Sequence, residues 1–277
     1  MTDLARLSAW LRCPVCGDDL SPAGPLVLGC TNGHRHDVNK RGYVSLLGGG
    51  SRHLGDTPDM LDARDRVLSS GAYDRIAQAV AAAASAGSPA RRILDAGAGT
   101  GHYLRAALAA ADGSTGLAMD LSPAAVARAL RSDDRIDGLV ADTWRPLPVR
   151  SGTVDAILDV FAPRNLPEFH RVLAPAGHLV VVVPRADHLG SLREAGTMLD
   201  IPADKADDVL AASASLYAPL TREHVAYDLP VTSGLVDALR GMGPSARHAA
   251  GAGATSASAV PTTTRVSVDV LTLARLP

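Results

Sequence analysis

All three cysteines of this 277-residue chain lie between residues 13 and 30, and a histidine follows four residues after the last of them. The segment reads CPVCGDDLSPAGPLVLGCTNGH, with the spacing C-x2-C, thirteen residues, then C-x3-H. An odd number of cysteines does not make a closed disulfide framework. Zinc takes four thiolate or imidazole ligands and commonly draws two of them from one C-x2-C turn. The spacing therefore predicts a zinc site, with the ligands Cys13, Cys16, Cys30 and His34.

A second histidine leaves the fourth ligand open. His36 would give the spacing C-x5-H, which is also sterically allowed, but the C-x3-H loop of His34 is tighter and is favoured here. Four protein ligands leave no position for a water molecule, so this zinc is expected to be structural. Metal-binding thiolates indicate a reducing compartment, and the start of the chain lacks the apolar core of a signal peptide. The expected location is the cytoplasm.

Composition limits the remaining possibilities. The longest apolar run, HLVVVVP at 178–184, has the length of a strand, so no membrane contact is expected. The 27 basic and 29 acidic residues give a formal net charge of −2, so any contact with nucleic acid is expected to be local. A hydrophobic content of 47% over this length is enough for one large domain beside a small one.

Apolar strand patterns alternate with helical patterns through the second and third quarters of the chain. Strands are predicted at 91–96, 115–120, 138–141, 154–161 and 178–184, and helices at 101–111, 123–131, 165–173 and 188–199. This alternation predicts an α/β fold, a doubly wound and mainly parallel sheet of the Rossmann-like class.

The segments on either side complete the expected organisation. Helices are predicted within 59–71, 72–87, 203–215 and 231–242, a loop at 251–263 and a closing strand at 264–276. The chain is thus expected to divide into a zinc-binding module (1–47), a helical linker (48–88) and a large domain (89–277).

The first strand of the large domain runs into the glycine-rich segment LDAGAGTGHYL. Gly97, Gly99 and Gly101 would let the backbone approach a ligand, next to the free N–H groups at a helix N-terminus. A dinucleotide-binding turn has the longer spacing G-x-G-x-x-G. The shorter spacing, with Asp95 two residues before the first glycine, is typical of methyltransferases of the Rossmann-like class that use S-adenosylmethionine.

Two more acids occupy the positions that this cofactor requires. Asp95 is predicted at the methionine end, Asp120 at the ribose hydroxyls and Asp142 at the adenine amino group. Alone, Asp120 is explained equally well as a helix N-terminal acid, and Asp142 as a turn residue. Their order along the chain, together with the glycines, supports the cofactor. His102 and Tyr103 complete the predicted cofactor site.

Nearly the whole chain resembles the RlmA family of 23S rRNA (guanine-N1)-methyltransferases, and in particular its macrolide-resistance (TlrB-like) branch. The resemblance rests on four segments: LRCPVCGDDL…LGCTNGHRHDVNKRGYVSLL, GDTPDMLDARDRVLSSGAYDRI, LDAGAGTGHYL and DAILDVFAPRNLPEFHRVLAPAGHLVVVVPRADHLGSLRE. It implies a homodimer in which the zinc module helps to form an RNA cleft. It also implies a guanosine substrate in hairpin 35, which lines the peptide exit tunnel.

Guanine N1 carries a proton at neutral pH, so its methylation requires a proton acceptor and stabilisation of the charge on O6. The segment LDVFAPRN offers Asp159 as the acceptor, Arg164 or Asn165 as donors toward O6, and Phe161 as a stacking surface. Asp159 is explained equally well as a buried structural acid.

Contacts with RNA phosphates are expected from the zinc module. Candidates are Arg35, His36, Lys40 and Arg41, followed by Arg52 and His53. Each of these residues alone is also consistent with an ordinary solvated surface.

Two other functions compete with rRNA methylation. One is a small-molecule methyltransferase of antibiotic biosynthesis, which leaves the zinc module unexplained. The other is a non-enzymatic, zinc-dependent RNA-binding protein, which leaves the complete set of cofactor acids unexplained. The sequence does not decide between nucleotides 748 and 745 of the rRNA, and we favour 748.

Overall fold

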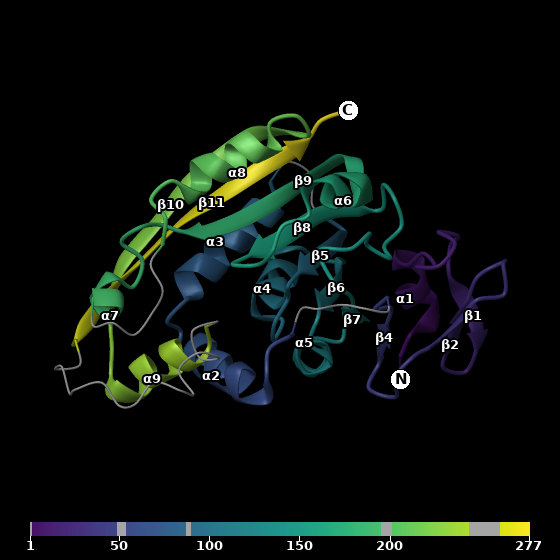
Figure 1. Ribbon diagram of the computed structural model, residues 1–277, viewed down its shortest axis with the longest axis horizontal. Helices are drawn as coiled ribbons and strands as arrows, with labels where there is room; N and C mark the ends of the chain where they lie inside the picture. Colours follow the sequence, from purple (N-terminus) through teal and green to yellow (C-terminus); the bar gives the residue numbers. More distant parts are fainter. Residues whose placement is uncertain (1, 49–53, 87–89, 195–200, 244–260) are drawn as a thin grey trace.

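The computed structural model describes all residues except 1, 49–53, 87–89, 195–200 and 244–260. The described residues form a small three-stranded sheet at one end and an eight-stranded sheet that makes up most of the molecule (Figure 1). The small sheet contains β1 (Ser21–Gly24), β2 (Val27–Gly29) and β3 (Arg35–Asp37), all antiparallel, and is preceded by α1 (Leu4–Trp10). We call residues 4–37 the ribbon.

The eight-stranded sheet has the order β10-β11-β9-β8-β5-β6-β7-β4. Its strands are β4 (Tyr43–Ser45), β5 (Arg92–Ala96), β6 (Thr115–Asp120), β7 (Ile136–Val140), β8 (Val154–Val160), β9 (Leu173–Pro184), β10 (Tyr217–Pro230) and β11 (Thr263–Arg275). Neighbours from β4 to β9 pair in parallel, and β11 pairs antiparallel with both β9 and β10. The predicted mainly parallel, doubly wound sheet is confirmed. The chain order reverses between β5 and β8, the place where open α/β sheets bind ligands at the carboxyl ends of their strands.

Helices cover both faces of this sheet because consecutive residues of its central strands point to opposite sides. On β5, Ile93 packs in one core and Leu94 in the other, and both are fully buried. The first core lies under α3 (Asp74–Ala84), α4 (His102–Ala110) and α9 (Ser233–Gly241), and the second lies under α1, α6 (Leu166–Val172) and α8 (Lys205–Ser213). The remaining helices are α2 (Pro58–Ser69), α5 (Pro123–Ser132) and α7 (Gly190–Glu194).

Helices α2 and α5 begin at residues whose side chains cap the helix. Thr57 caps α2 by accepting from the N–H of Met60, and Ser122 caps α5 by accepting from the N–H of Ala125. A proline follows each cap at the first helical position, where its missing N–H costs nothing. These caps fix the points at which α2 and α5 begin, at the edge of the sheet where the parallel strands have their carboxyl ends.

A buried carboxylate attaches the ribbon to the large sheet. Asp137 of β7 is 2% exposed and accepts from Arg6 Nε at 2.9 Å and from Trp10 Nε1 at 3.0 Å. Arg92 of β5 stacks over the Trp10 ring, with its Cζ 4.1 Å from the ring centroid. α1 is therefore held by charge, hydrogen bonds and aromatic packing at once.

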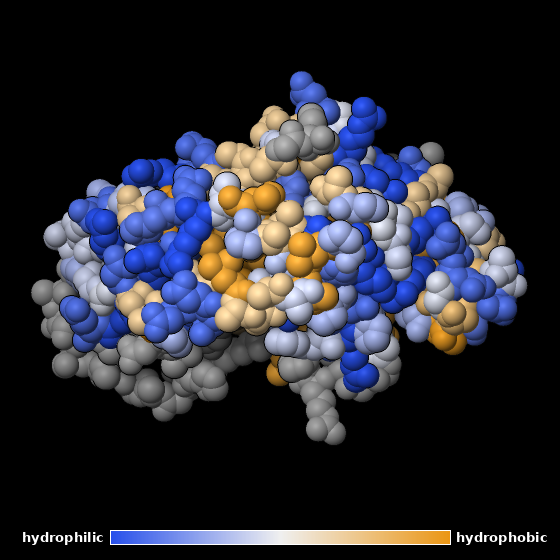
Figure 2. All heavy atoms as spheres, turned by 90° about the horizontal axis from the view of Figure 1, so that it is seen from above, coloured by the Kyte–Doolittle hydropathy of each residue, from blue (hydrophilic) through white to orange (hydrophobic). Residues whose placement is uncertain are grey.

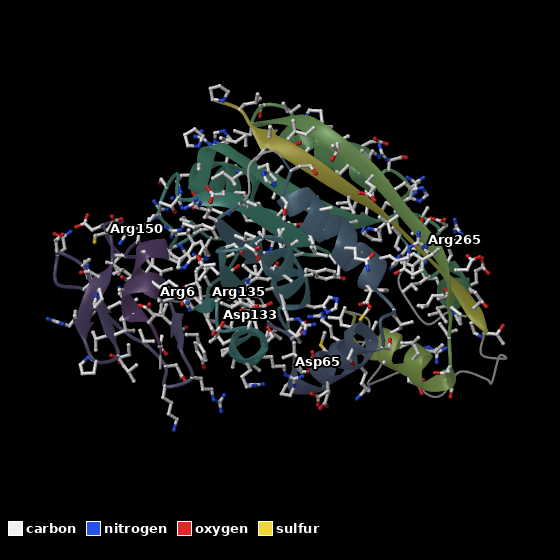
Figure 3. The ribbon with its side chains drawn as sticks, turned by 180° about the vertical axis from the view of Figure 1, so that it is seen from behind. Arg6, Asp65, Asp133, Arg135, Arg150 and Arg265 are labelled. Carbon is white, nitrogen blue, oxygen red and sulfur yellow. The ribbon has the colours of Figure 1, made fainter. Side chains whose placement is uncertain are left out.

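A second arginine, Arg150, also bonds to the ribbon at this junction. Arg150 donates to the carbonyl oxygens of Ser8, Leu11 and Leu20, and forms an ion pair with Asp19 at 2.9 Å. Figure 3 shows Arg6 and Arg150 at the side of the molecule where the ribbon joins the large sheet. Since three of these bonds go to backbone carbonyls, the junction depends on the path of the ribbon more than on its side chains.

Strand β4 follows the ribbon directly but belongs to the large sheet. Tyr43, Val44 and Ser45 pair with Gly138, Leu139 and Val140 of β7. The division into residues 1–47, 48–88 and 89–277 stays a prediction, and the last strand before residue 47 extends the sheet of the large domain.

The strands and helices predicted between residues 91 and 184 are present, although β9 begins at Leu173 instead of 178. After them, α7 covers only part of the helix predicted at 188–199. The closing strand is β11. β10 was not predicted, because its central residues Thr221–His224 are all polar and it contains Pro219. Pairing with β11 along its whole length forms this edge strand. Most of the predicted loop 251–263, and residues 195–199 of the predicted helix, lie outside the described residues.

In the described part of the chain, no helix combines the length and the apolar character that crossing a bilayer requires. Figure 2 shows one face of the molecule, where hydrophobic residues gather in the middle and hydrophilic residues lie on both sides.

Gly138 tests the junction of β4 with the sheet. A Cβ at this position would lie 2.7 Å from Val126 Cγ1 and 2.8 Å from Tyr43 Cβ. We expect Gly138→Ala to lower the free energy of unfolding by about 1–3 kcal/mol, as overpacking of a core does. Gly234→Ala is the control, since nothing lies within 4 Å of the added Cβ. Alanine in α9 should raise the same free energy by up to about 1 kcal/mol. Urea unfolding measures both, and equal stability of the two variants would contradict the packing argument.

Candidate functional site

The structure brings the four predicted metal ligands together. The ligand atoms of Cys13, Cys16, Cys30 and His34 all lie within 4.8 Å of one another. The Sγ atoms of Cys16 and Cys30 are 3.6 Å apart, and Cys30 Sγ is 3.4 Å from His34 Nδ1. A tetrahedral zinc with Zn–S bonds of about 2.3 Å places its sulfur ligands about 3.8 Å apart. The donor set and its spacing therefore fit zinc.

Two glycines form the knuckles that present these ligands. Gly17 and Gly33 each have φ of +82°, a conformation that other residues rarely adopt. Across the two knuckles, Asp18 accepts from Thr31 Oγ1 at 2.6 Å and from Asn32 Nδ2 at 2.8 Å. The ligand loops are thus cross-linked by hydrogen bonds as well as by their common ligand cluster.

The site favours the thiolate form at Cys16. A hydrogen bond from Asn32 lowers the pKa of the Cys16 thiol to about 6, whereas burial raises the pKa of Cys13. His36, the alternative ligand, has its Nε2 3.5 Å from Cys13 Sγ. His36 therefore contacts a ligand sulfur from outside the cluster of four, the position of residues that orient metal ligands.

The glycine-rich turn lies at the carboxyl end of β5 and leads into α4. Gly97, Gly99 and Gly101 have φ values of +86°, +53° and +82°. A Cβ on Gly97 would lie 2.6 Å from Ala162 Cβ, and one on Gly101 would lie 2.8 Å from Ala129 Cβ. The turn therefore requires glycine for its backbone conformation and for close packing between β8 and α5.

A pocket of about 400 Å³ opens at this turn. Its wall comes from α2, the glycine turn, the start of α4, the end of β8, the segment after β9, and the ends of α8 and α9. The lining residues are Arg64, Leu68, Tyr73, Gly97, Ala98, Gly99, Thr100, His102, Tyr103, Val160, Phe161, Pro184, His188, Leu189, Arg193, Ile201, Lys205, Leu239, Met242 and Gly243. The pocket lies at the switch point of the sheet, where the sequence analysis places the cofactor.

Two carboxyl groups lie buried on the neighbouring strands β5 and β8 at this edge. Asp95 is 1% exposed and Asp159 is fully buried, and the Oδ2 atom of each has no hydrogen-bond partner among the described residues. Burial, and then the charge of Asp120, raise the pKa of Asp95 to about 8. Burial also raises the pKa of Asp159 well above its usual range, against the effect of Arg164. Such a pair is suited to face a cation.

Asp120 and Asp142 lie at the ends of the next two strands, as predicted. The carboxylate of Asp120 accepts from the N–H of Gly99 at 2.9 Å and from that of Ser122 at 2.8 Å. Asp142 follows β7 and accepts from the N–H of Trp144 at 3.0 Å. A carboxylate accepts about four hydrogen bonds, so Asp120 retains capacity for two hydroxyl groups. Asp120 and Asp142 do not line the pocket described above.

His102 and Tyr103 open α4 and line the pocket. Tyr103 Oη and His102 Nε2 are buried and have no hydrogen-bond partner among the residues that the structure describes. Burial raises the pKa of Tyr103, so its hydroxyl keeps its proton. Both groups can therefore donate or accept a hydrogen bond within the pocket.

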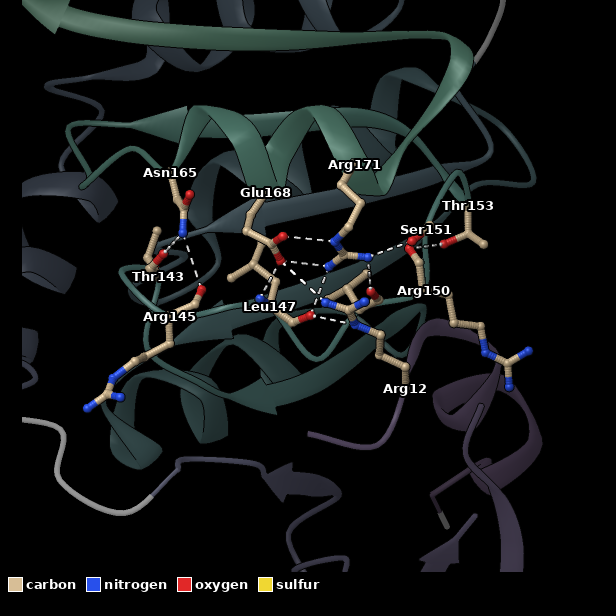
Figure 4. Close-up of polar contacts among 11 residues, drawn as sticks. Arg12, Thr143, Arg145, Leu147, Arg150, Ser151, Thr153, Asn165, Glu168 and Arg171 are labelled. Atoms are coloured by element: carbon tan, nitrogen blue, oxygen red, sulfur yellow. Dashed lines mark hydrogen bonds and ion pairs between the residues drawn. The ribbon is translucent and has the colours of Figure 1, made fainter. Parts of the chain in front are cut away.

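The two predicted donors toward O6 are engaged with the protein itself. Asn165 Nδ2 donates to the carbonyl oxygens of Thr143 and Arg145, as Figure 4 shows. Arg164 forms an ion pair with Asp159 at 3.3 Å. Neither side chain lines the pocket, so both are placed to hold the loop after β8.

Phe161 lines the pocket and is 40% exposed. Its φ of +55° is unusual for a residue with a side chain and indicates local strain, which is often found at functional sites. The sequence analysis did not identify three further wall residues: Arg64, Tyr73 and His188. Arg64 forms an ion pair with Asp56 and would meet a Cβ on Gly99 at 3.0 Å. No local sequence signal connects these residues, because they come from α2, the start of α3 and the segment after β9.

The predicted RNA contacts on the ribbon side are accessible. Arg35, Lys40 and Arg41 are exposed and His36 is partly exposed. Arg35 donates to the carbonyl oxygen of Ala23. Arg52 and His53 lie outside the described residues.

Two family models match the chain. The N-terminal zinc-ribbon model of RlmA matches residues 11–50, and a methyltransferase-domain model matches residues 93–177. The first contains all four predicted metal ligands, and the second contains the glycine turn, Asp95, Asp120, Asp142 and Asp159.

Among solved structures, a chain of the Haloferax volcanii complex of the Trm112 methyltransferase activator with a methyltransferase has a TM-score of 0.52 and 18% identity. The match covers 80% of this chain and all of that one. A protein of Bacillus halodurans, described provisionally as a methyltransferase, has a TM-score of 0.50 and 13% identity, with coverage of 73% and 98%. These likenesses concern the fold.

Curated relatives match over most of the chain. A Streptomyces fradiae protein named 23S rRNA (guanine(748)-N(1))-methyltransferase is 38% identical, with 86% of each chain covered. A Micromonospora griseorubida protein, named provisionally as a 23S rRNA (guanine-N(1)-)-methyltransferase, is 41% identical, with coverage of 86% and 87%. At this identity and coverage, the chain belongs to the family of 23S rRNA (guanine-N1)-methyltransferases, enzymes that use S-adenosylmethionine, and it carries the family's zinc ribbon.

Proposed function

We propose that this enzyme methylates N1 of guanosine 748 in hairpin 35 of 23S rRNA, in the wall of the peptide exit tunnel, and thereby raises tolerance to tylosin-type macrolides. The relative from Streptomyces fradiae, which is named for nucleotide 748, supports this choice over nucleotide 745. The observation that carries the proposal is the pocket at the switch point, which combines the glycine turn with the accessible ring of Phe161.

The cofactor site is built from residues on three neighbouring strands. In this proposal Asp95 and the wall residues His102 and Tyr103 surround the methionine end, Asp120 accepts from the ribose hydroxyls, and Asp142 meets the adenine amino group. Gly97, Gly99 and Gly101 leave room for the adenosyl group, since a Cβ on Gly99 would already meet Arg64. The guanidinium of Arg64, which lies on the pocket wall and pairs with Asp56, would be one of the cations that face the methionine carboxylate.

The charge of the cofactor explains the unpartnered carboxyl groups. S-adenosylmethionine supplies a methyl group from a positively charged sulfonium and also carries an ammonium group. A positive charge near Asp95 and Asp159 favours their ionised forms and opposes the effect of burial. A bound cofactor would thus favour Asp159 as a proton acceptor.

The substrate end of the pocket suits an unstacked base. Sequence-specific RNA enzymes often turn a base out of its loop and stack it on an aromatic ring. Phe161 offers that ring at the carboxyl end of β8, two residues after Asp159. Arg35 and His36 of the ribbon, with Lys40 and Arg41 directly after it, would contact phosphates around the hairpin. A homodimer would extend this RNA-binding surface, and an rRNA substrate agrees with the cytoplasmic location expected from the sequence.

Expression of this enzyme in a bacterial host that lacks the methylation is the test of substrate. Mass mapping of the 23S rRNA should show one added methyl on guanosine 748, and primer extension should stop there because a methyl on N1 blocks the base-pairing edge. Tolerance to tylosin should rise in the same cells. An expression strain carrying Gly99→Arg, which fills the adenosyl site, is the control.

Other products would contradict the proposal in different ways. A methyl on nucleotide 745 would contradict the choice of target. Transfer of label from S-adenosylmethionine to a small metabolite, and not to rRNA, would instead favour an enzyme of antibiotic biosynthesis. RNA binding without any transfer would favour a non-enzymatic RNA-binding protein.

Replacement of the metal ligands tests the ribbon. Purified wild type should contain about one zinc per chain, and Cys13→Ser and His34→Gln should each lose it and unfold the ribbon, because metal binding and folding are coupled. His36→Gln is the matched control and should keep its zinc. Metal analysis with circular dichroism measures both effects. Zinc retained by His34→Gln and lost from His36→Gln would reassign the fourth ligand.

Two acids are expected to have separable roles. Asp120→Ala should weaken S-adenosylmethionine binding at least about tenfold, because hydrogen bonds to a charged group contribute about 1.5–3 kcal/mol each. Asp159→Asn should keep that affinity and slow methyl transfer by about 10²–10⁴-fold, the usual effect of losing a general base. Calorimetry measures the first and single-turnover transfer measures the second. A fully active Asp159→Asn variant would make Asp159 a structural acid.

A further inference from the structure

The pocket wall contains an aromatic group that the cofactor does not explain. Tyr73, Phe161 and His188 all line the pocket. The ring centroids of Phe161 and His188 are 6.0 Å apart, and those of Tyr73 and Phe161 are 6.3 Å apart. Phe161 is the exposed member, while Tyr73 and His188 are buried behind it. The group therefore has an accessible aromatic face, formed by Phe161, and a buried polar edge, formed by Tyr73 and His188.

The hydrogen bonds of His188 determine which of its nitrogens carries the proton. The backbone N–H of Ser267 donates to His188 Nδ1 at 3.2 Å, so Nδ1 is an acceptor. A neutral imidazole then has its proton on Nε2. Nε2 has one described partner, Tyr73 Oη, at the long distance of 3.4 Å. His188 thus holds an N–H donor at the pocket wall with a weak partner, which a ligand can replace.

The surroundings keep His188 neutral. Burial, and then the charge of Arg193, lower the pKa of His188 to about 4, although Asp187 acts in the opposite direction. The remaining titratable group against it is Tyr73, whose pKa is raised by burial, so it carries no charge at neutral pH. The imidazole is therefore a fixed neutral donor over the working range of the enzyme.

We propose that His188 is a catalytic residue whose Nε2–H donates a hydrogen bond to O6 of the target guanine. This inference rests on the proposed function and deepens it. A guanine stacked on Phe161 would turn its polar edge, on which O6 is adjacent to N1, toward His188, whose ring centroid is 6.0 Å from that of Phe161. Asn165 and Arg164 do not line this wall, since Asn165 donates to the carbonyl oxygen of Thr143 and Arg164 is paired with Asp159.

The N–H group of His188 would stabilise the negative charge that develops on O6 during methyl transfer. The transfer forms the N1–C bond and breaks the S–C bond of the donor, whose sulfur keeps that electron pair and becomes a neutral thioether. The N1 proton passes to Asp159, the acceptor of the proposed function, and negative charge develops on O6. A fixed donor aimed at that oxygen stabilises the transition state more than the ground state.

His188→Gln and His188→Met form a matched pair for the test. Both remove the Nδ1 acceptor and have similar length, but only glutamine keeps an N–H donor near the position of Nε2. With hairpin 35 RNA and saturating S-adenosylmethionine, we expect His188→Met to lower kcat by roughly 10²-fold at pH 7, as loss of one such donor does. Its KM for RNA and its affinity for S-adenosylmethionine should stay unchanged. His188→Gln should recover most of the lost rate.

The pH profile separates this role from a structural one. As the pH rises toward the range in which guanine N1 ionises by itself, the deficit of His188→Met should shrink, because less charge stabilisation is then required. Arg66→Met, on the exposed face of α2 and outside the pocket wall, is the control and should leave the pH profile unchanged. Equal and pH-independent losses in the two His188 variants would overturn the proposal, as would full activity of His188→Met or a pH-dependent loss in Arg66→Met.

The same assay distinguishes this inference from the proposed function. Wild type that makes no N1-methylguanosine on hairpin 35 RNA contradicts the proposed function and this inference with it. Wild type that makes the product while His188→Met makes it equally fast contradicts only the role of His188.

Discussion

The carboxylate of Asp137 joins the two parts of the molecule. It lies near the start of β7, is 2% exposed, and accepts hydrogen bonds from Arg6 and Trp10 of the first helix. A buried carboxylate without partners is costly, so α1 has one favourable position against the sheet. That position orients the ribbon and leads the chain into β4, which pairs with the same strand. The metal site is thereby held at the far edge of a sheet whose centre carries the pocket.

The centre of that sheet has the opposite character, because each of its two buried carboxyl groups keeps one oxygen without a partner among the described residues. Asp95 and Asp159 lie on adjacent strands below the glycine turn, with raised pKa values and unpartnered oxygens. Asp137 contributes to the fold through partners supplied by the protein, whereas Asp95 and Asp159 would find theirs in a cationic cofactor. The cost of burying a charge is therefore offset by protein partners at Asp137, and would be offset by a bound cofactor at Asp95 and Asp159.

The residues that were predictable from the sequence are those whose partners lie nearby in the chain. The four metal ligands span 22 residues, and Asp95 and the three glycines span seven. Asp120 and Asp142 were found because each follows a strand of a repeating α/β pattern. β10 was missed because its pairing with β11 forms it, against a polar central sequence. Strand β4, which follows the ribbon, could not be assigned to the large sheet for the same reason, since its partner β7 lies more than ninety residues away.

His188 shows the same limit at the level of chemistry. A histidine after an apolar strand carries no signal by itself, and its tautomer depends on the N–H of Ser267, 79 residues later in the chain. Its neighbours Tyr73 and Phe161 come from two further segments of the fold. The antiparallel insertion of β11 beside β9 brings Ser267 to this wall. The strand that closes the sheet thus also sets the proton position of the proposed donor, and this link between fold and catalysis is visible only once the sheet order is known.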